Sequence, residues 1–209
     1  MSPSPARTSR VAIVAAARAV LEDDGLEAVT MVSVAERVGV RPPSLYKHVR
    51  DRSALLTAVV EDAAEELRAV LVAAAPSVPD DGTDAPSRRI AALAAAYRTF
   101  ARQSPRATAL LFADIAPAGG LGVEMIARVA APVIEAAGAL AGPERALPAA
   151  RVLTAFVHGF TSMELAGAFH LGGDVDEAFE AGVEALVRGL GTPAAQSATG
   201  SARPGTRSR

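Results

Sequence analysis

The side chains best suited to nucleic-acid chemistry gather in one short segment, residues 37–52. This segment holds five basic residues and one acid, a local charge of +4, although the whole chain of 209 residues has a net charge of −2. Within it Tyr46, Lys47 and His48 are consecutive, and their polar atoms can reach phosphate oxygens or base edges. Arg50 and Arg52 follow immediately. A basic run is by default a solvated face, so its meaning depends on the elements that carry it.

Two short predicted helices carry this basic segment. Thr30 is a favourable N-cap for a helix over 31–38, and Gly39 is a favourable residue to end it. Pro42 and Pro43 suit the first turn of a second helix that extends to Val49. A first helix is expected from Thr8 or Ser9 to Asp24. The apolar residues with the spacing to hold the two short helices against it are Val34, Ala35, Val38, Val40 and Leu45. This arrangement is a helix-turn-helix, whose second helix fits the major groove of DNA.

The same residues resemble the N-terminal signature of the TetR family of bacterial transcriptional regulators. The resemblance covers roughly residues 10–58, and its most specific part is Leu45-Tyr46-x-His48 after an Ala-x-x-x-Gly-Val turn. It implies that Tyr46 and His48 contact phosphates and the groove. Arg52 stands where the family usually has Lys, which keeps the charge but changes the hydrogen-bonding geometry. The candidate DNA-binding residues are Ser33, Arg41, Pro42, Pro43, Ser44, Tyr46, Lys47, His48 and Arg52.

The rest of the chain also predicts helices, so the expected fold class is all-α. Half of the residues are hydrophobic but only 4% are aromatic, so alanine, a strong helix former, supplies much of the apolar content. The expected helices cover 51–75, 87–103, 105–113, 120–141, 145–170 and 174–190, with Pro132 and Pro148 kinking or shortening theirs. A Pro-rich break over 76–86 divides the chain. We expect an N-terminal arm and helix-turn-helix domain (1–58), a connecting helix and linker (59–86), a ligand-binding and dimerisation domain (87–191) and a disordered tail (192–209).

The second half carries a weaker resemblance, to the WHG-type C-terminal domain of some TetR regulators. Phe156-Val157-His158-Gly159-Phe160 is similar to that motif, with Val157 where Trp is frequent. The family implication is a homodimer whose larger domain binds a small molecule. An aromatic and Met stripe is more often core, and His158 is as readily a hydrogen-bonded core residue as a ligand contact. The candidate ligand-binding residues are Tyr97, Phe100, Phe112, Met125, Phe156, His158, Phe160 and Met163.

Enzyme signatures are absent from the sequence. The chain has no Cys, and it lacks Gly-x-Ser-x-Gly, P-loop and His-Glu-x-x-His motifs. The glycine run 119–122 lacks the later glycine of a dinucleotide loop. His170 with Asp174 and Asp176 could suggest a metal site, but a Gly-Gly turn followed by an acidic helix start explains the two acids better. We therefore expect no catalytic residue, metal or cofactor. Without a recognisable signal peptide or membrane-spanning segment, a cytoplasmic location is expected.

These patterns predict a ligand-responsive transcriptional regulator, most simply a repressor. Its expected partners are a palindromic double-stranded DNA operator, a small-molecule effector and a second copy of the chain, with no membrane. The alternative is a protein that binds or sequesters a small apolar ligand and whose helix-turn-helix is only a packing module. An enzyme working through His158 and Glu164 is a distant third. The small residues Gly159, Gly167, Gly182 and Gly189 favour close helix packing in a two-fold dimer interface.

Overall fold

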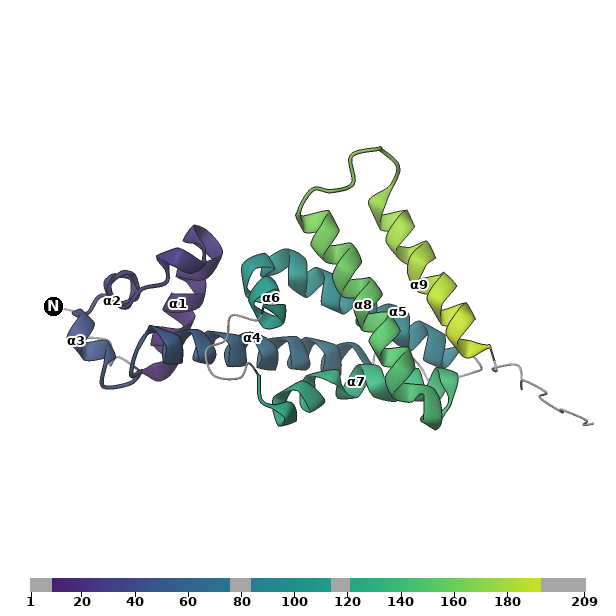
Figure 1. The fold of residues 1–209 in the computed structure, drawn as a ribbon, viewed down its shortest axis with the longest axis horizontal. Helices are drawn as coiled ribbons and strands as arrows, with labels where there is room; N and C mark the ends of the chain where they lie inside the picture. The colour runs from purple at the N-terminus through teal and green to yellow at the C-terminus, as the bar shows by residue number, and fades with distance from the viewer. Residues whose placement is uncertain (1–8, 76–83, 114–120, 193–209) are drawn as a thin grey trace, which may run out of the picture.

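The computed structural model of the chain describes residues 9–75, 84–113 and 121–192, and within these ranges it is all-α, as predicted. In Figure 1 a small bundle at one end is joined to a larger bundle by the long helix α4. No helix among the described residues is long and apolar enough to cross a membrane. The elements are α1 Arg10–Asp24, η1 Leu26–Ala28, α2 Met31–Val38, α3 Pro42–Leu45, α4 Arg52–Ala74, α5 Ala85–Gln103, α6 Pro105–Phe112, α7 Val123–Ala141, η3 Pro143–Arg145, α8 Ala146–Leu165 and α9 Val175–Gly191.

Local capping fixes the ends of the first helices where the sequence predicts them. The Ser9 hydroxyl accepts a hydrogen bond from the backbone N–H of Ala12, and the Thr30 hydroxyl accepts one from Ser33. Gly39 ends α2 in the left-handed conformation with φ of +79°, which glycine adopts without steric cost. These caps satisfy N–H and carbonyl groups that a helix end leaves unpaired. The predicted apolar set packs as expected, with Val34, Ala35 and Leu45 buried and Val38 and Val40 against the same core.

The predicted helix from Pro42 to Val49 is wrong in its length. α3 ends at Leu45, and residues 46–48 form a turn. The backbone N–H groups of His48 and Val49 both donate to the carbonyl of Leu45, at 2.8 and 2.9 Å. Leu45 and Val49 are both buried in the core of α1, α2 and α4. The chain therefore turns back to bury Val49 and leaves the residues between them on the surface.

Helix α8 also ends earlier than predicted, at Leu165 instead of residue 170. Gly167 takes a positive φ of +66°, and the backbone N–H of Ala168 donates to the carbonyl of Met163. This closing pattern ends the helix, so Phe169 and His170 lie in the connection to α9. Pro148 occupies the first turn of α8, where its missing N–H has no intrahelical partner to lose, so the kink expected there is not needed. The remaining helices begin or end within three residues of their predicted bounds.

Several expectations fall wholly or partly outside the described residues. They are the N-terminal arm (1–8), the Pro-rich break (76–86), the glycine run (119–122) and the tail (192–209). The division of the chain into four functional regions stays a prediction.

Candidate nucleic-acid interface and ligand cavity

The turn after α3 presents three consecutive polar side chains on the outer surface of the small bundle. Tyr46, Lys47 and His48 are all exposed, and Tyr46 retains 55% of its accessible surface. The buried residues Leu45 and Val49 flank them and anchor the turn. An aromatic ring this exposed contributes little to the core of the bundle. The arrangement therefore offers hydrogen-bonding groups on a rigid base, which is what a surface that contacts DNA requires.

The residues before and after this turn extend the same surface. Arg41 is the exposed N-cap of α3, Pro43 is exposed, and Pro42 and Ser44 are half-buried. On the other side, Arg50 donates to the carboxylate of Asp51 at 2.8 Å and keeps 84% of its side-chain surface. The Ala54 N–H and the Arg50 guanidinium lower the pKa of Asp51. Arg41, Lys47 and Arg50 of the predicted basic segment are thus all exposed around this turn.

Two of the predicted DNA-binding residues are used inside the fold. The Ser33 hydroxyl donates to the carbonyl of Ala28 at 2.6 Å and accepts from the backbone N–H of Thr30 at 3.0 Å. The Arg52 guanidinium donates through Nε to the carbonyl of Val29 at 2.6 Å and through Nη2 to that of Leu26 at 2.8 Å. Both side chains therefore hold the segment between α1 and α2 in place. Any contact they make with DNA competes with these bonds.

The larger bundle encloses a cavity of about 350 Å³, within the range of small-molecule sites. Its wall combines residues from α4, α5, α6, α7 and α8, with Leu121 just before α7. Leu67, Leu93 and Leu153 are typical of this wall, and Tyr97 and Thr154 are its polar members. Phe112 and Ile126 are about half exposed, so they lie where the cavity approaches solvent. The bundle therefore provides an apolar site with few hydrogen-bonding groups.

The structure brings two of the eight candidate ligand residues, Tyr97 and Phe112, to the wall of this cavity. A third candidate, His158, is not on the cavity wall but contacts both of these residues. Its Nδ1 shares a hydrogen bond of 2.8 Å with the Tyr97 hydroxyl, and its ring stacks on Phe112 with centroids 3.9 Å apart. Burial raises the pKa of Tyr97 and lowers that of His158. Both groups are therefore neutral at neutral pH.

The other five candidates lie away from the cavity wall. Phe100 is buried in the core of the larger bundle, and Met163 is half exposed. Phe156 and Phe160 pack with Phe179 of α9, with ring centroids between 5.3 and 6.1 Å apart. The Met125 sulfur accepts a hydrogen bond from Arg128. The aromatic stripe on α8 thus joins helices to one another. The cavity wall consists mainly of aliphatic residues that the sequence analysis did not single out, because nothing in their spacing separates them from core.

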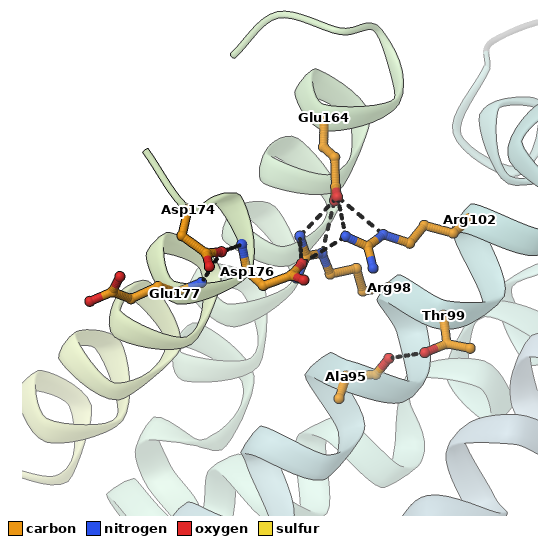
Figure 2. Close-up of polar contacts among 8 residues, drawn as sticks. All are labelled: Ala95, Arg98, Thr99, Arg102, Glu164, Asp174, Asp176 and Glu177. Atoms are coloured by element: carbon orange, nitrogen blue, oxygen red, sulfur yellow. Dashed lines mark hydrogen bonds and ion pairs between the residues drawn. The ribbon is translucent and has the colours of Figure 1, made fainter. Parts of the chain in front are cut away.

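An ion-pair cluster that the sequence analysis missed ties α5 to α8 and α9 (Figure 2). Arg98 and Arg102 of α5 both bond the carboxylate of Glu164 at the end of α8, and both pair with Asp176 in the first turn of α9. The Arg98 guanidinium also lies 4.5 Å from the Phe179 ring centroid. Burial raises the pKa of Glu164, but the two arginines together outweigh it and lower the pKa below its ordinary value. The i, i+4 spacing of the two arginines was the only signal for this cluster in the sequence.

Helix α6 touches both the cavity and the small bundle. At its C-terminal end, Leu111 and Phe112 line the cavity. At its N-terminal end, the carboxylate of Glu22 in α1 accepts from the backbone N–H groups of Arg106 and Ala107, at 3.1 and 2.8 Å. Ala107 and Leu110 are buried in the core formed by α1–α4. Helix α6 therefore connects the cavity wall to α1.

Comparison with known proteins agrees with both halves of this description. Residues 13–59 match the family model described as "Bacterial regulatory proteins, tetR family", and residues 90–186 match "Tetracyclin repressor-like, C-terminal domain". The chain is 30% identical over 171 residues to the uncharacterized HTH-type transcriptional regulator Rv0681 of Mycobacterium tuberculosis, covering 78% of this chain and 73% of that protein. It is 28% identical over 192 residues to the uncharacterized HTH-type transcriptional regulator YobS of Bacillus subtilis, covering 91% and 96%.

A solved structure shows the same arrangement of helices. It is described as a protein with unknown function from Rhodococcus sp. RHA1, and it superposes with a TM-score of 0.76 at 28% identity. The match covers 92% of this chain and 100% of that chain. The similarity extends through both the small bundle and the larger one.

Proposed function

Since the chain belongs to the TetR family of transcriptional regulators, we propose that it is a repressor that a small molecule releases from a palindromic operator. The observation that carries the proposal is the exposed run Tyr46–His48 beside a one-turn helix in a helix-turn-helix. Such a surface fits the major groove, where side chains reach base edges. Arg41 and Arg50 flank it and are suited to the phosphates on either side.

The operator is read by two copies of the chain. A palindromic site requires two recognition surfaces about one helical turn apart, on the order of 34–36 Å. The outer face of α8 supports such a pairing, because Val152 and Met163 are exposed there and the space beside Gly159 is open. Exposed apolar residues on one helix are typical of an interface. In this proposal α8 and α9 pair with their copies across a two-fold axis.

The effector occupies the cavity of the larger bundle and changes the spacing of the two recognition surfaces. Binding releases DNA only if the effector has a higher affinity for the conformation that fits the operator poorly. We propose that α6 carries this change to the small bundle, together with α4. The support is the pair of contacts that α6 makes, with the cavity through Phe112 and with α1 through Glu22.

Selection from random DNA pools, followed by sequencing, tests the operator proposal. We expect the wild-type protein to enrich a palindromic motif. Tyr46→Ala should weaken binding to that motif about tenfold or more, as loss of a base or phosphate contact does. The matched control is Val123→Ala, which truncates an exposed residue at the start of α7, away from the proposed DNA and dimer surfaces, and should bind as the wild type does.

Two results would count against this function. A folded wild-type protein that enriches no motif at low salt would favour the alternative, a binding or sequestering protein that uses only the cavity. Wild-type affinity in a folded Tyr46→Ala protein would remove the assignment of the turn as the recognition surface. Circular dichroism of each variant separates loss of contact from loss of fold.

A further inference from the structure

The cavity wall carries no charged side chain among the described residues. Every wall residue from the described ranges is aliphatic or aromatic except Thr154, and the only further polar atom is the Tyr97 hydroxyl. A charged group that enters such a site loses its hydration and gains no partner, which is far more costly than burial of a neutral group. The wall therefore selects against ions of either sign.

The charged residue that follows the polar wall residue Tyr97 is engaged elsewhere. Arg98 follows Tyr97 directly, but its guanidinium pairs with Glu164 and Asp176 (Figure 2). The same guanidinium also lies over the Phe179 ring. Glu164 is held between Arg98 and Arg102. Neither the Glu164 carboxylate nor the Asp176 carboxylate is on the cavity wall. Among the described wall residues a cationic ligand therefore meets no carboxylate, and an anionic ligand meets no guanidinium.

The Tyr97 hydroxyl has capacity left for one more hydrogen bond. A phenolic hydroxyl can donate once and accept through its lone pairs, and the bond to Nδ1 of His158 uses one of these positions. If the hydroxyl donates to His158, it still accepts from a ligand. If it accepts from His158, it still donates. A ligand hydroxyl satisfies either arrangement, because it can both donate and accept.

We propose that the effector is an uncharged, mainly hydrocarbon molecule with one hydrogen-bonding oxygen, and that the Tyr97 hydroxyl recognises this oxygen. A water molecule in the liquid occupies about 30 Å³, so the cavity accommodates roughly a dozen non-hydrogen atoms. This inference rests on the proposed function, because it names the chemical class of the effector. It makes Tyr97 the specificity-determining residue of the cavity, with His158 fixing the position of its hydroxyl.

Isothermal titration calorimetry of the full chain, without DNA, tests the proposal with three probes that share one hydrocarbon chain. The probes are 1-octanol, octanoate and octyltrimethylammonium, at pH 7.4 and below their micellar concentrations. We expect 1-octanol to bind one site per chain with a Kd at least tenfold lower than that of either ion. Ala130→Trp, which fills the cavity from the α7 wall, should abolish this binding.

Removal of one hydroxyl tests the role of Tyr97. Tyr97→Phe should raise the Kd for 1-octanol about three- to tenfold, the usual effect of one hydrogen bond. The matched control is Thr99→Val, which removes a hydroxyl from the same helix α5. That hydroxyl is on an exposed residue and donates to the carbonyl of Ala95 (Figure 2), so the control should bind 1-octanol as the wild type does.

Several outcomes would overturn the proposal. They are an ion that binds as tightly as 1-octanol, no binding of 1-octanol, binding that survives Ala130→Trp, or a Tyr97→Phe protein that is indistinguishable from Thr99→Val. None of these results depends on DNA. A chain that selects a palindromic operator yet prefers an ion would overturn only this inference. A chain that ranks the probes as expected but selects no operator would overturn only the proposed repressor.

Discussion

Arg50 and Arg52 are one residue apart in the basic segment, yet they have different surroundings. Arg50 is almost fully exposed beside the recognition turn and pairs with Asp51. Arg52 is partly buried, and its guanidinium donates to the carbonyls of Val29 and Leu26. Those carbonyls lie in and beside η1, the short connection between α1 and α2. One arginine is therefore available to phosphates, while the other stabilises the bundle.

Alanine substitutions should separate these two roles. Arg52→Ala leaves two carbonyls without their charged donor, so we expect it to lower the free energy of unfolding by about 1–3 kcal/mol. Arg50→Ala should change the free energy of unfolding by less than about 0.5 kcal/mol, as exposed substitutions usually do, but weaken operator binding. Urea unfolding followed by circular dichroism measures the first effect. Equal stability of the two variants would contradict the structural role of Arg52.

For single residues, the sequence predicted which side chains have groups that can bind DNA. It did not predict which of those groups are already hydrogen-bonded inside the fold. Tyr46, Lys47 and His48 are exposed as a DNA-contact role requires. Ser33 and Arg52 carry equally suitable groups, but backbone partners near them engage those groups. The carbonyls that Arg52 contacts belong to residues 23 and 26 positions earlier in the chain. No local spacing reveals such a contact, because it forms only when the bundle closes.

Helices α8 and α9 approach each other closely where glycine faces an aromatic ring. A methyl group added at Gly182 of α9 would overlap the Phe156 ring of α8. That ring is also packed against Phe160 and Phe179, so it has little freedom to move aside. The same addition at Gly189, about two turns further along α9, meets no atom within 4 Å. The close approach of the Phe156 ring therefore favours glycine at position 182, whereas no such steric constraint acts at position 189.

Alanine at these two positions should change stability in opposite directions. Gly182→Ala should lower the free energy of unfolding by about 1–3 kcal/mol, the usual cost of overpacking. Gly189→Ala should raise it by up to about 1 kcal/mol, because alanine is the better helix former. Thermal unfolding of both variants at one protein concentration makes the comparison. A Gly182→Ala protein as stable as Gly189→Ala would show that the ring moves aside without cost.

Helix positions were well predicted because their ends have local causes. Ser9, Thr30 and Asp51 each cap the helix that follows, and such caps are visible in the sequence. The end of α8 was predicted less well, because Phe169 continues its apolar pattern beyond the turn at Gly167. Apart from Tyr97 and Phe112, the cavity wall could not be predicted from the sequence. Five helices contribute to it, and an aliphatic residue that lines a cavity has the same spacing as one that packs in a core.

The whole molecule separates its charges along its length. Residues 37–52 have a local charge of +4 at the proposed DNA surface, whereas residues 143–191 contain three arginines and seven acids, a charge of −4. Such a distribution orients the chain in the field of DNA. It also means that the net charge of −2 says little about nucleic-acid binding, because only the facing surface takes part.

The salt dependence of operator binding should therefore depend on the position of a charge. Each phosphate contact releases a counterion, so the logarithm of affinity falls with the logarithm of salt concentration. Lys47→Gln should reduce the magnitude of this slope by about 1. Arg188→Gln, on the exposed surface of α9, should leave it unchanged. Fluorescence anisotropy over a range of salt concentrations measures both. An affinity that does not depend on salt would exclude the proposed interface.

The two prolines that open α3 reduce the backbone conformational entropy that the recognition segment loses when the protein binds DNA. A helix of one turn is unstable by itself, because its few hydrogen bonds do not offset the entropy of ordering the backbone. Pro42 and Pro43 fix φ in that turn before any partner binds. Restricting the free chain in this way reduces the entropy lost on association. The recognition turn is therefore preorganised, and more of its contact energy remains available for affinity.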